Sequence, residues 1–345
     1  MRTGLGLAAA GMLWMACASA PASSSKAQTE STSSTTASPR ARPAPSAERR
    51  PASPPPTARP ARVSASPFAV DPNVDLKARW SVVPNRTWQT VTYRGSAGDR
   101  IPALFRAARR PGRRPAIILG HGHGGDARSM ARFFGSLLSR RVHVLAVNHP
   151  YSGHDRKVPG EDICPRDARR LVKRWIRAVR DLRYAARLLA ERPDVDPQRI
   201  GYLGFSLGAC LGALFVAHEP RVRAAALVSP AGTWSVLAAT DSYWHIGWHH
   251  QPLAQWLRDP TLRAQLAIID PARSIARFAP RPLLVVVGQR DKVIRDISGL
   301  TVFRAAGKGK RLIHHPGGHG PGRTLRRRVT RWLERQLYGE TPPAR

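Results

Sequence analysis

The sequence predicts an α/β protein in which a mainly parallel β-sheet is covered by helices on both faces. Short, wholly apolar runs recur along the chain, as expected of strands that are buried on both faces of a sheet. They alternate with longer segments of helical periodicity, and this alternation is typical of parallel sheets. A Gly-x-Ser-x-Gly stretch, Gly204–Gly208, lies where one of the apolar runs gives way to a helical one.

The expected elements alternate after an initial hairpin. Gln89–Tyr93 and Ile101–Arg106 have the pattern of two antiparallel strands joined by the turn Arg94–Asp99. Further strands are expected at Ala116–Leu119, Val142–Val147, Ile200–Leu203, Ala224–Val228, Leu283–Val287 and Lys310–His314. Helices are expected at Arg128–Ser139, Cys164–Glu191, Leu207–His218 and Thr324–Tyr338.

The alternation stops between Ser229 and Pro280, where we expect an inserted cap. The segment follows the strand that comes after the helix Leu207–His218, and a cap inserted there would cover a site at the end of the sheet. It is rich in large aromatic side chains, namely Trp234, Tyr243, Trp244, Trp248 and Trp256. Two interpretations stay open for each of them: it lines a pocket, or it belongs to the cap's own small core.

The chain begins with a segment of the signal-peptide type. Met1–Ala16 has a short basic start and an apolar core that is too short to be a stable membrane anchor. Cleavage after Ala18 fits the A-x-A pattern, whereas lipidation of Cys17 fits a lipobox in which Trp14 replaces the usual Leu. Residues 1–20 therefore predict export. We favour a lipoprotein anchored to the envelope through Cys17, with a freely secreted or periplasmic protein as the alternative.

A linker and one folded domain are expected after this signal. Residues 21–67 consist mainly of Ser, Thr, Pro, Ala and Arg, with almost no large apolar side chain. Such a segment buries too little apolar surface to offset the entropy of ordering it, so we expect a disordered linker. Residues 68–340 have a length that suits one α/β domain, with its cap at about 229–280.

The chain is strongly basic, with 56 Lys and Arg against 22 Asp and Glu and a formal charge of +34. Residues 1–67 account for +6 of this charge, so +28 remains on the folded part. It is clustered at Arg106–Arg114, Arg166–Arg187 and Arg323–Arg335. No zinc-finger, RNP or helix-turn-helix pattern accompanies the clusters, so specific nucleic-acid binding is not expected. A surface of this charge would still attract anionic polymers or envelope phosphates.

Two cysteines, Cys164 and Cys210, remain once Cys17 is assigned to export. In an oxidising compartment they could form one disulfide. Cys210 lies on the expected helix that follows the Gly-x-Ser-x-Gly stretch, where a small core residue is the favoured interpretation. The same interpretation is favoured for Cys164.

Gly204–Gly208 has the pattern of a nucleophile elbow, a tight strand-to-helix turn that presents a serine. Little more than hydrogen fits at the flanking positions of such a turn, which explains the two glycines. We therefore predict that Ser206 is a nucleophile. The alternative is a Gly-rich connection that contains an incidental serine.

A serine nucleophile needs a base to remove its proton, and the base needs a third group to orient it. In a parallel sheet such groups come from loops at the carboxyl ends of strands. Asp291 follows the expected strand Leu283–Val287, and His319 follows the last strand. The order Ser206, Asp291, His319 therefore predicts a catalytic triad. The rival candidates for the acid and the base are Asp296, His314 and His315.

Acyl transfer also needs N–H groups that bind the developing oxyanion. One is expected from the backbone of Leu207, at the N-terminus of the helix that follows Ser206, where the helix dipole helps. The other is expected from the backbone of His123, within the HGGG-type segment His121–Gly125.

No metal and no cofactor are expected. A zinc pair formed by His121 and His123 is the alternative to their place in the oxyanion segment, but no carboxylate or further histidine stands near them at metal-ligand spacing. His249 and His250 are expected at the surface of the cap.

The chain resembles the α/β-hydrolase-fold serine hydrolases. The run Asp181–Ala209 is similar to their dienelactone-hydrolase and acetyl-xylan-esterase branches. Asn148–His154 resembles the D-x-x-G-x-G loop of that fold, with departures at its first and last residues. The similarity covers about Val91–Leu337 and implies the α/β-hydrolase fold with an inserted cap. The nucleophile is Ser206 and not the cysteine of dienelactone hydrolase itself, so lactone chemistry is not implied.

These features predict an exported carboxylester hydrolase that works through an acyl-enzyme on small-molecule or acylated-sugar esters. A peptidase of the prolyl-oligopeptidase type would use the same triad, but the chain before Phe68 is too short for its propeller. A non-catalytic envelope-binding lipoprotein with a hydrolase fold is the other alternative. It would need neither a complete triad nor a glycine-rich oxyanion segment.

Overall fold

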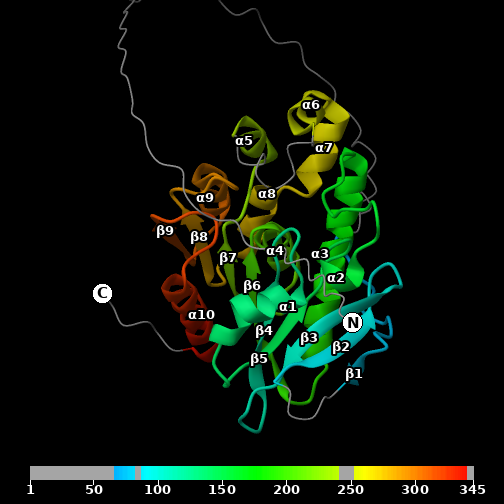
Figure 1. Cartoon of the computed structure of the whole chain (residues 1–345), viewed down its shortest axis with the longest axis vertical. Coiled ribbons are helices and arrows are strands. Elements are labelled where there is room, and N and C mark those ends of the chain that lie inside the picture. The colour runs from blue at the N-terminus through cyan, green and yellow to red at the C-terminus, as the bar shows by residue number, and fades with distance from the viewer. Residues whose placement is uncertain (1–65, 82–86, 241–251, 340–345) are drawn as a thin grey trace, which may run out of the picture. The chain divides into compact units, whose positions relative to one another are not determined.

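A nine-stranded β-sheet forms the centre of the computed structural model, which describes residues 66–81, 87–240 and 252–339 (Figure 1). The strand order is β1-β2-β3-β5-β4-β6-β7-β8-β9. The strands are β1 Arg79–Ser81, β2 Gln89–Arg94, β3 Arg100–Arg106, β4 Arg114–Gly120, β5 His143–Val147, β6 Val195–Phe205, β7 Val222–Val228, β8 Leu283–Gly288 and β9 Lys310–His315.

Strand direction divides the sheet into two parts. The first strands, β1 to β3, are antiparallel, and β3 joins the rest of the sheet by antiparallel pairing with β5. From β5 through β9 every pairing is parallel. Parallel strands end at the same edge of a sheet, so the loops after β4, β6, β8 and β9 come together at the carboxyl edge. The expected hairpin and the mainly parallel sheet are both confirmed.

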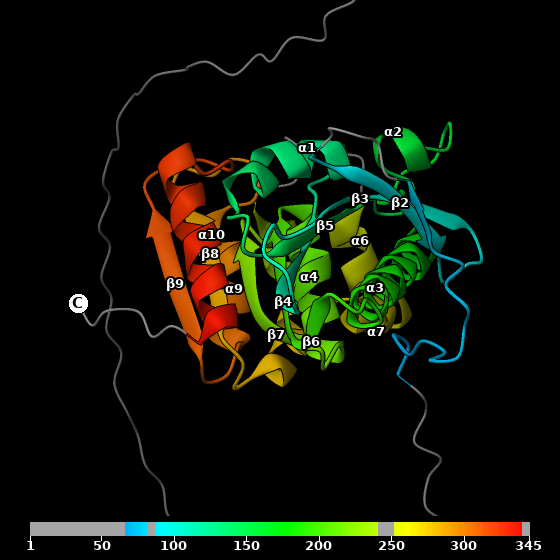
Figure 2. The same ribbon diagram turned by 90° about the horizontal axis from the view of Figure 1, so that it is seen from below.

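Helices cover both faces of the sheet (Figures 1 and 2). The helices that pack on the sheet include α1 Ala127–Phe133, α3 Ala168–Ala190, α4 Leu207–His218, α9 Asp296–Ala305 and α10 Arg323–Tyr338. Side chains that alternate along the strands face two different cores. Ile118 and Tyr202 share one core with α3, α4 and α9, while Leu119 and Leu203 share the other with α1 and α10. The predicted α/β class is confirmed.

Two helices differ from the expected ones in their boundaries, and two short elements were not expected. The helix expected at Arg128–Ser139 ends at Phe133 and is followed by a 3₁₀ turn at Gly135–Leu137, where Gly135 lies too close to Trp88 for a side chain. Helix α3 begins at Ala168 and not at Cys164, because the Asp167 carboxylate accepts the N–H of Arg170 and caps the helix there. The short elements β1 and α2, Gly153–Arg156, carry no periodicity that the sequence could reveal.

The stretch expected to form the cap contains four short helices among its described residues. These are α5 Trp234–Ala239, α6 Leu253–Arg258, α7 Pro260–Ile268 and α8 Pro271–Ile275. Trp234 and Trp256 are buried in the large core, and the Trp234 indole N–H donates to the Leu266 carbonyl at 2.9 Å. These two therefore serve packing. Tyr243, Trp244, Trp248, His249 and His250 lie outside the described residues.

Part of the basic charge on α3 serves the fold. The Arg180 and Arg183 guanidiniums donate to the carbonyls of Pro67 and Phe68 at 2.9 and 2.7 Å. Arg187 donates to three further carbonyls of the same segment, those of Asp71, Pro72 and Val74. Because these arginines hold the start of the folded domain against α3, they are engaged side chains and not a free anion-binding surface.

Cys164 and Cys210 are both buried and are not joined to each other, so the disulfide that the sequence allowed for them does not form. Cys210 lies in the middle of α4, where its sulfur accepts the N–H of Ala231 at 3.1 Å, and burial raises the pKa of its thiol to about 12. In the described parts of the chain, none of the helices is long and apolar enough to span a bilayer.

Candidate active site

The turn from β6 to α4 holds Ser206 in a strained backbone conformation. Its φ is 54° and its ψ is −119°, a region that side-chain-bearing residues rarely occupy. The N–H of Ser206 donates to the Val228 carbonyl at 2.8 Å, and its own carbonyl accepts from Ala209 and Cys210 as α4 begins. The turn thus fixes the serine at the carboxyl edge of the sheet, between two parallel strands.

Both glycines of the motif are required by backbone contacts. A Cβ at Gly204 would lie 2.3 Å from the Gly208 carbonyl oxygen. A Cβ at Gly208 would lie 2.3 Å from the carbonyl oxygen of Gly120, at the end of β4. Because backbone atoms cannot move aside as a flexible side chain can, only glycine fits at either position.

The structure brings Ser206, His319 and Asp291 into one chain of hydrogen bonds. The Ser206 Oγ lies 2.9 Å from the Nε2 of His319, and the Nδ1 of His319 lies 2.8 Å from the Oδ2 of Asp291. The side chain of Asp291 is 1% exposed and that of His319 is 11% exposed. A carboxylate on Nδ1 requires that this nitrogen carry the proton, which leaves Nε2 free to accept the serine proton.

Neighbouring groups hold the acid and the base in place. The Oδ1 of Asp291 accepts the backbone N–H groups of Val293 and Ile294 at 2.8 and 2.9 Å. The hydroxyl of Ser229 donates to the backbone carbonyl of His319 at 2.8 Å. The Ser229 contact was not foreseen, because nothing in the sequence links a serine after β7 to a loop after β9.

The rival residues form a separate pair. His314 Nε2 lies 2.9 Å from Asp296 Oδ2, and both side chains are about one-third exposed. The Nδ1 of His315 accepts the Gly317 N–H at 3.1 Å, and burial lowers the pKa of this histidine. Within the described residues, the side chain of Ser206 is hydrogen-bonded to His319 and to none of these three.

The glycine-rich segment after β4 lies against the serine. A Cβ on Gly122 would be 3.3 Å from the Cβ of Ser206. His121 is fully buried, its Nε2 accepts the backbone N–H of His149 at 3.1 Å, and its Nδ1 therefore donates to the Gly122 carbonyl at 2.8 Å. Burial lowers the pKa of His121 to about 4, so the ring is neutral at physiological pH.

The orientation of the peptide between Gly122 and His123 follows from these contacts. The carbonyl of Gly122 accepts from His121 and also from the N–H of Gly125 at 3.0 Å. In a trans peptide the N–H points opposite to the carbonyl, so the N–H of His123 points away from both of these donors. Leu207 occupies the first position of α4, where helix geometry leaves its N–H without an intrahelical acceptor.

The side chain of His123 has a partner that the sequence did not reveal. Its Nε2 lies 2.9 and 3.1 Å from the two carboxylate oxygens of Asp162, 39 residues further along the chain. The expectation of no metal rested in part on the lack of such a carboxylate at metal-ligand spacing. Residues so far apart come together only through the tertiary fold, so spacing could not have found this pair.

Comparison with known proteins agrees with the architecture. A family model described as "alpha/beta hydrolase fold" matches residues 115–263. The chain is 29% identical over 230 residues to an uncharacterised protein of Mycobacterium tuberculosis, covering 66% of this chain and 70% of that one. It is 23% identical over 262 residues to the putative hydrolase YtaP of Bacillus subtilis, covering 69% of this chain and 84% of that one.

Solved structures of similar fold include two acetyl xylan esterases. Acetyl xylan esterase 1 from Thermoanaerobacterium sp. has a TM-score of 0.63 at 20% identity, covering 77% of this chain and 89% of its own. The acetyl xylan esterase from Paenibacillus sp. R4 has a TM-score of 0.63 at 18% identity, covering 75% and 88%. The chain thus has the α/β-hydrolase fold. Within that fold its architecture is similar to that of the acetyl xylan esterases, as the sequence resemblance implied.

Proposed function

We propose that this protein is a serine hydrolase that cleaves carboxylic esters through an acyl-enzyme. The observation that carries the proposal is the hydrogen-bonded chain from the Ser206 hydroxyl through His319 to the buried carboxylate of Asp291. A serine in a strained turn, a histidine with a fixed tautomer and an orienting carboxylate are what acyl transfer needs.

The proposed first half-reaction forms the acyl-enzyme. The Nε2 of His319 takes the proton of the Ser206 hydroxyl as its oxygen attacks the ester carbonyl carbon. The resulting imidazolium then protonates the leaving alkoxide, and the alcohol departs. In the second half-reaction a water loses its proton to Nε2, attacks the acyl carbon and releases the acid. Asp291 orients the ring and stabilises its charged form in both steps.

The backbone N–H groups of Leu207 and His123 are proposed to bind the oxyanion. Leu207 opens α4, so its N–H lies at the positive end of a helix dipole. The N–H of His123 belongs to the peptide whose carbonyl His121 and Gly125 already hold. A peptide that is oriented before substrate arrives costs no reorganisation during the reaction, which is the physical basis of such a site.

The substrate class that we propose is small-molecule or acylated-sugar esters. The supporting observations are the resemblance to acetyl-xylan-esterase sequences and the similarity of fold to two acetyl xylan esterases. We further propose that residues 1–20 direct export and that a lipid on Cys17 anchors the chain to the envelope. Mass spectrometry of the mature N-terminus tests the anchor, because a chain that begins at Ser19 or beyond contradicts it.

A fluorophosphonate probe separates the hydrolase from a binding-only lipoprotein. Such probes bond covalently to activated serines, so we expect one adduct per chain, located on Ser206 by peptide mass spectrometry. An unlabelled protein would favour the binding lipoprotein. A panel of p-nitrophenyl esters of graded acyl length and acetylated sugars would then define the substrate, and cleavage of peptides but not esters would favour the peptidase alternative.

A further inference from the structure

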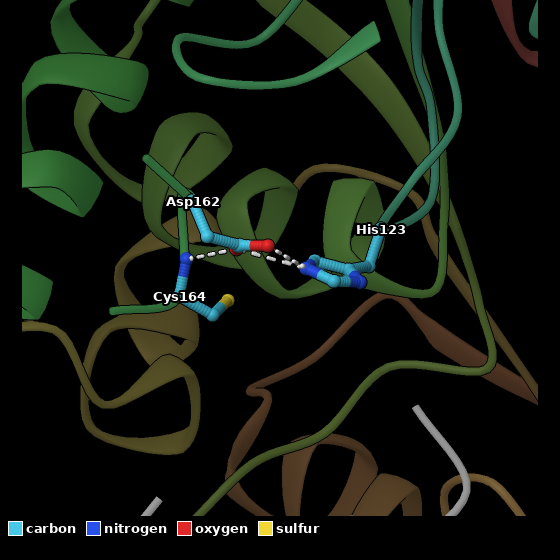
Figure 3. A group of neighbouring side chains, drawn as sticks. All are labelled: His123, Asp162 and Cys164. Carbon is cyan, nitrogen blue, oxygen red and sulfur yellow. Dashed lines mark hydrogen bonds and ion pairs between the residues drawn. The ribbon is translucent and has the colours of Figure 1, made fainter. Parts of the chain in front are cut away.

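We propose that His123, Asp162 and Cys164 form a binding site for one divalent cation of the zinc class. Figure 3 shows the three side chains pointing toward one another, with His123 in the loop after β4 and the other two in the loop before α3. Their ligand atoms, an imidazole nitrogen, a carboxylate oxygen and a thiol sulfur, all lie within 4.8 Å of one another. No function considered for the chain so far uses the carboxylate or the thiol.

The spacing of these atoms is close to what a bound cation requires. Zinc binds nitrogen and oxygen at about 2.0–2.2 Å and sulfur at about 2.3 Å, so tetrahedral ligands lie roughly 3.3–3.7 Å apart. The Nε2 of His123 is 2.9 Å from the nearer oxygen of Asp162. This pair must open by a few tenths of an ångström, and the sulfur must move inward by roughly 1.5 Å at most.

The loop that carries Asp162 and Cys164 is already held in place. The backbone N–H of Cys164 donates to the Oδ1 of Asp162 at 2.7 Å, and this bond fixes the carboxylate next to Cys164 (Figure 3). Arg174 on α3 donates both to the backbone carbonyl of Asp162 and to the carboxylate of Glu161. A ligand loop fixed from behind in this way loses little conformational freedom when it binds a cation.

Burial differs among the three ligands in a way that suits a site open on one side. Cys164 is only 7% exposed, whereas the side chains of His123 and Asp162 are 23% and 50% exposed. A cavity of about 400 Å³ lies beside His123 and Asp162, and Tyr151 and Ser152 also line it. Water in this cavity can complete the coordination, as in zinc sites with three protein ligands and an open fourth position.

The charge around the cavity also favours a cation. Among the described residues that line it are three carboxylates, those of Asp126, Glu161 and Asp162, and one ammonium group, that of Lys157. Arg174 compensates the charge of Glu161, so the remaining excess is modest. An added divalent charge is attracted by such an environment, although the chain as a whole is basic.

The donor set selects the kind of cation. A thiolate is a soft ligand and imidazole a borderline one, so this combination prefers Zn²⁺ and similar transition metals over Mg²⁺ or Ca²⁺. On binding, the Cys164 thiol releases its proton to solvent and forms a bond from sulfur to metal. The proton on Nε2 of His123 is replaced by one on Nδ1 through exchange with solvent, so that the ring stays neutral and Nε2 can donate its electron pair to the metal.

The molecule contains a matched control. His314 and Asp296 form a histidine–aspartate pair with the same 2.9 Å separation and similar exposure, but no cysteine belongs to their group in the described part of the chain. Cys210 is the matched control for the thiol, because it is a buried cysteine that belongs to no group of three metal-ligating side chains in the described part of the chain. Variants of His314 and Cys210 therefore show whether zinc binding needs all three ligands or only a histidine–aspartate pair or a buried thiol.

The experiment measures zinc binding directly, so its outcome does not depend on ester hydrolysis. The full chain is purified with a histidine-free tag and titrated with ZnCl₂ by calorimetry against a competing chelator. We expect Asp162→Asn and Cys164→Ala each to lower the affinity of the chain for zinc by tenfold or more. The control variants His314→Gln and Cys210→Ala should leave this affinity unchanged. Replacement of zinc by Co²⁺ should give a thiolate-to-cobalt absorption band that Cys164→Ala abolishes.

Three results would overturn the site. The first is a wild-type chain that binds no zinc at micromolar concentration. The second is a Cys164→Ala variant that keeps the wild-type affinity, and the third is a loss of affinity in only one of the two ligand variants. If Cys164→Ala fails to fold, the half-exposed Asp162→Asn decides together with the cobalt band of the wild type, because that band requires sulfur coordination.

Discussion

Two histidine–aspartate pairs lie at the same end of the sheet, and they differ in what surrounds them. Both aspartates follow β8, and both histidines lie on or after β9. The nitrogen-to-oxygen distances are nearly equal, 2.8 Å for His319 and Asp291 and 2.9 Å for His314 and Asp296. The first pair is almost completely buried and contacts Ser206, whereas the second is about one-third exposed.

This difference shows that pairing alone does not make a catalytic group. An exposed pair competes with water and contributes about 0–1 kcal/mol. A buried pair whose carboxylate accepts two further backbone N–H groups is held in one orientation, so it can present Nε2 to a nucleophile. His314 lies on β9, the last strand of the sheet, which explains its exposure to solvent. His319 lies beyond it, in the loop that folds back over Ser206.

The largest effect on ester turnover is expected when the hydroxyl of Ser206, which contacts the buried pair, is removed. Ser206→Ala should lower ester turnover by a factor on the order of 10⁴ to 10⁶, because the nucleophile and its base act as a unit. The fold should persist, since among the described residues the Ser206 hydroxyl is hydrogen-bonded to His319 alone. Steady-state kinetics on a p-nitrophenyl ester, with circular dichroism as the check on folding, measures this. Undiminished turnover would exclude Ser206 as the nucleophile.

The two aspartates should respond very differently to the same substitution. Asp291→Asn should reduce kcat by about 10⁴-fold, because an amide no longer selects the tautomer that leaves Nε2 free. Asp296→Asn should leave kcat within about twofold, because an exposed pair contributes little. Parallel kcat measurements on the two variants decide between the pairs. Equal losses in both variants would contradict the assignment of Asp291 as the orienting acid.

Two glycines near the buried pair should differ in their effect on stability. Gly208→Ala should lower the free energy of unfolding by about 3 kcal/mol or more, because its Cβ meets the Gly120 carbonyl at 2.3 Å. Gly320→Ala, next to His319, should change it by less than about 0.5 kcal/mol, since no atom lies within 4 Å of the new Cβ. Urea unfolding of both variants measures the difference. A stable Gly208→Ala protein would mean that the elbow relaxes more readily than the contacts allow.

The smallest predicted effect concerns a buried imidazole. The pKa of His121 is about 4 in the folded protein, because burial disfavours the charged ring, against about 6.5 in the unfolded chain. Between these values the unfolded state binds more protons, so the free energy of unfolding should fall as the pH drops from about 6.5 to 4. His121 contributes up to about 3 kcal/mol of that loss, which is complete below pH 4.

A variant isolates this contribution. In His121→Gln the fall in the free energy of unfolding across the same pH window should be shallower. It should not vanish, because burial also lowers the pKa values of His149 and His218. Thermal unfolding at a series of pH values compares the two slopes. An unchanged slope would show that His121 is not held neutral by burial.

The sequence alone determined the fold class and the local motifs. Apolar runs and helical periods identify strands and helices because each element must bury one face or both, and the tight turn at Gly204–Gly208 requires its glycines locally. The order Ser206, Asp291, His319 was readable because parallel strands gather their following loops at one edge. These features depend on neighbours along the chain or on a simple rule of sheet topology.

Only the tertiary structure decided how distant side chains meet. Asp296 lies five residues after Asp291, and His314 lies five residues before His319. The sequence pattern does not reveal which aspartate and which histidine are buried. Asp162, in the segment before α3, contacts His123, in the loop after β4, although 39 residues separate them in the sequence. Such contacts depend on loop paths and side-chain packing, which no local periodicity encodes. For that physical reason the hydrogen-bonded chain at Ser206 and the three-ligand group at His123 emerge only from the folded chain.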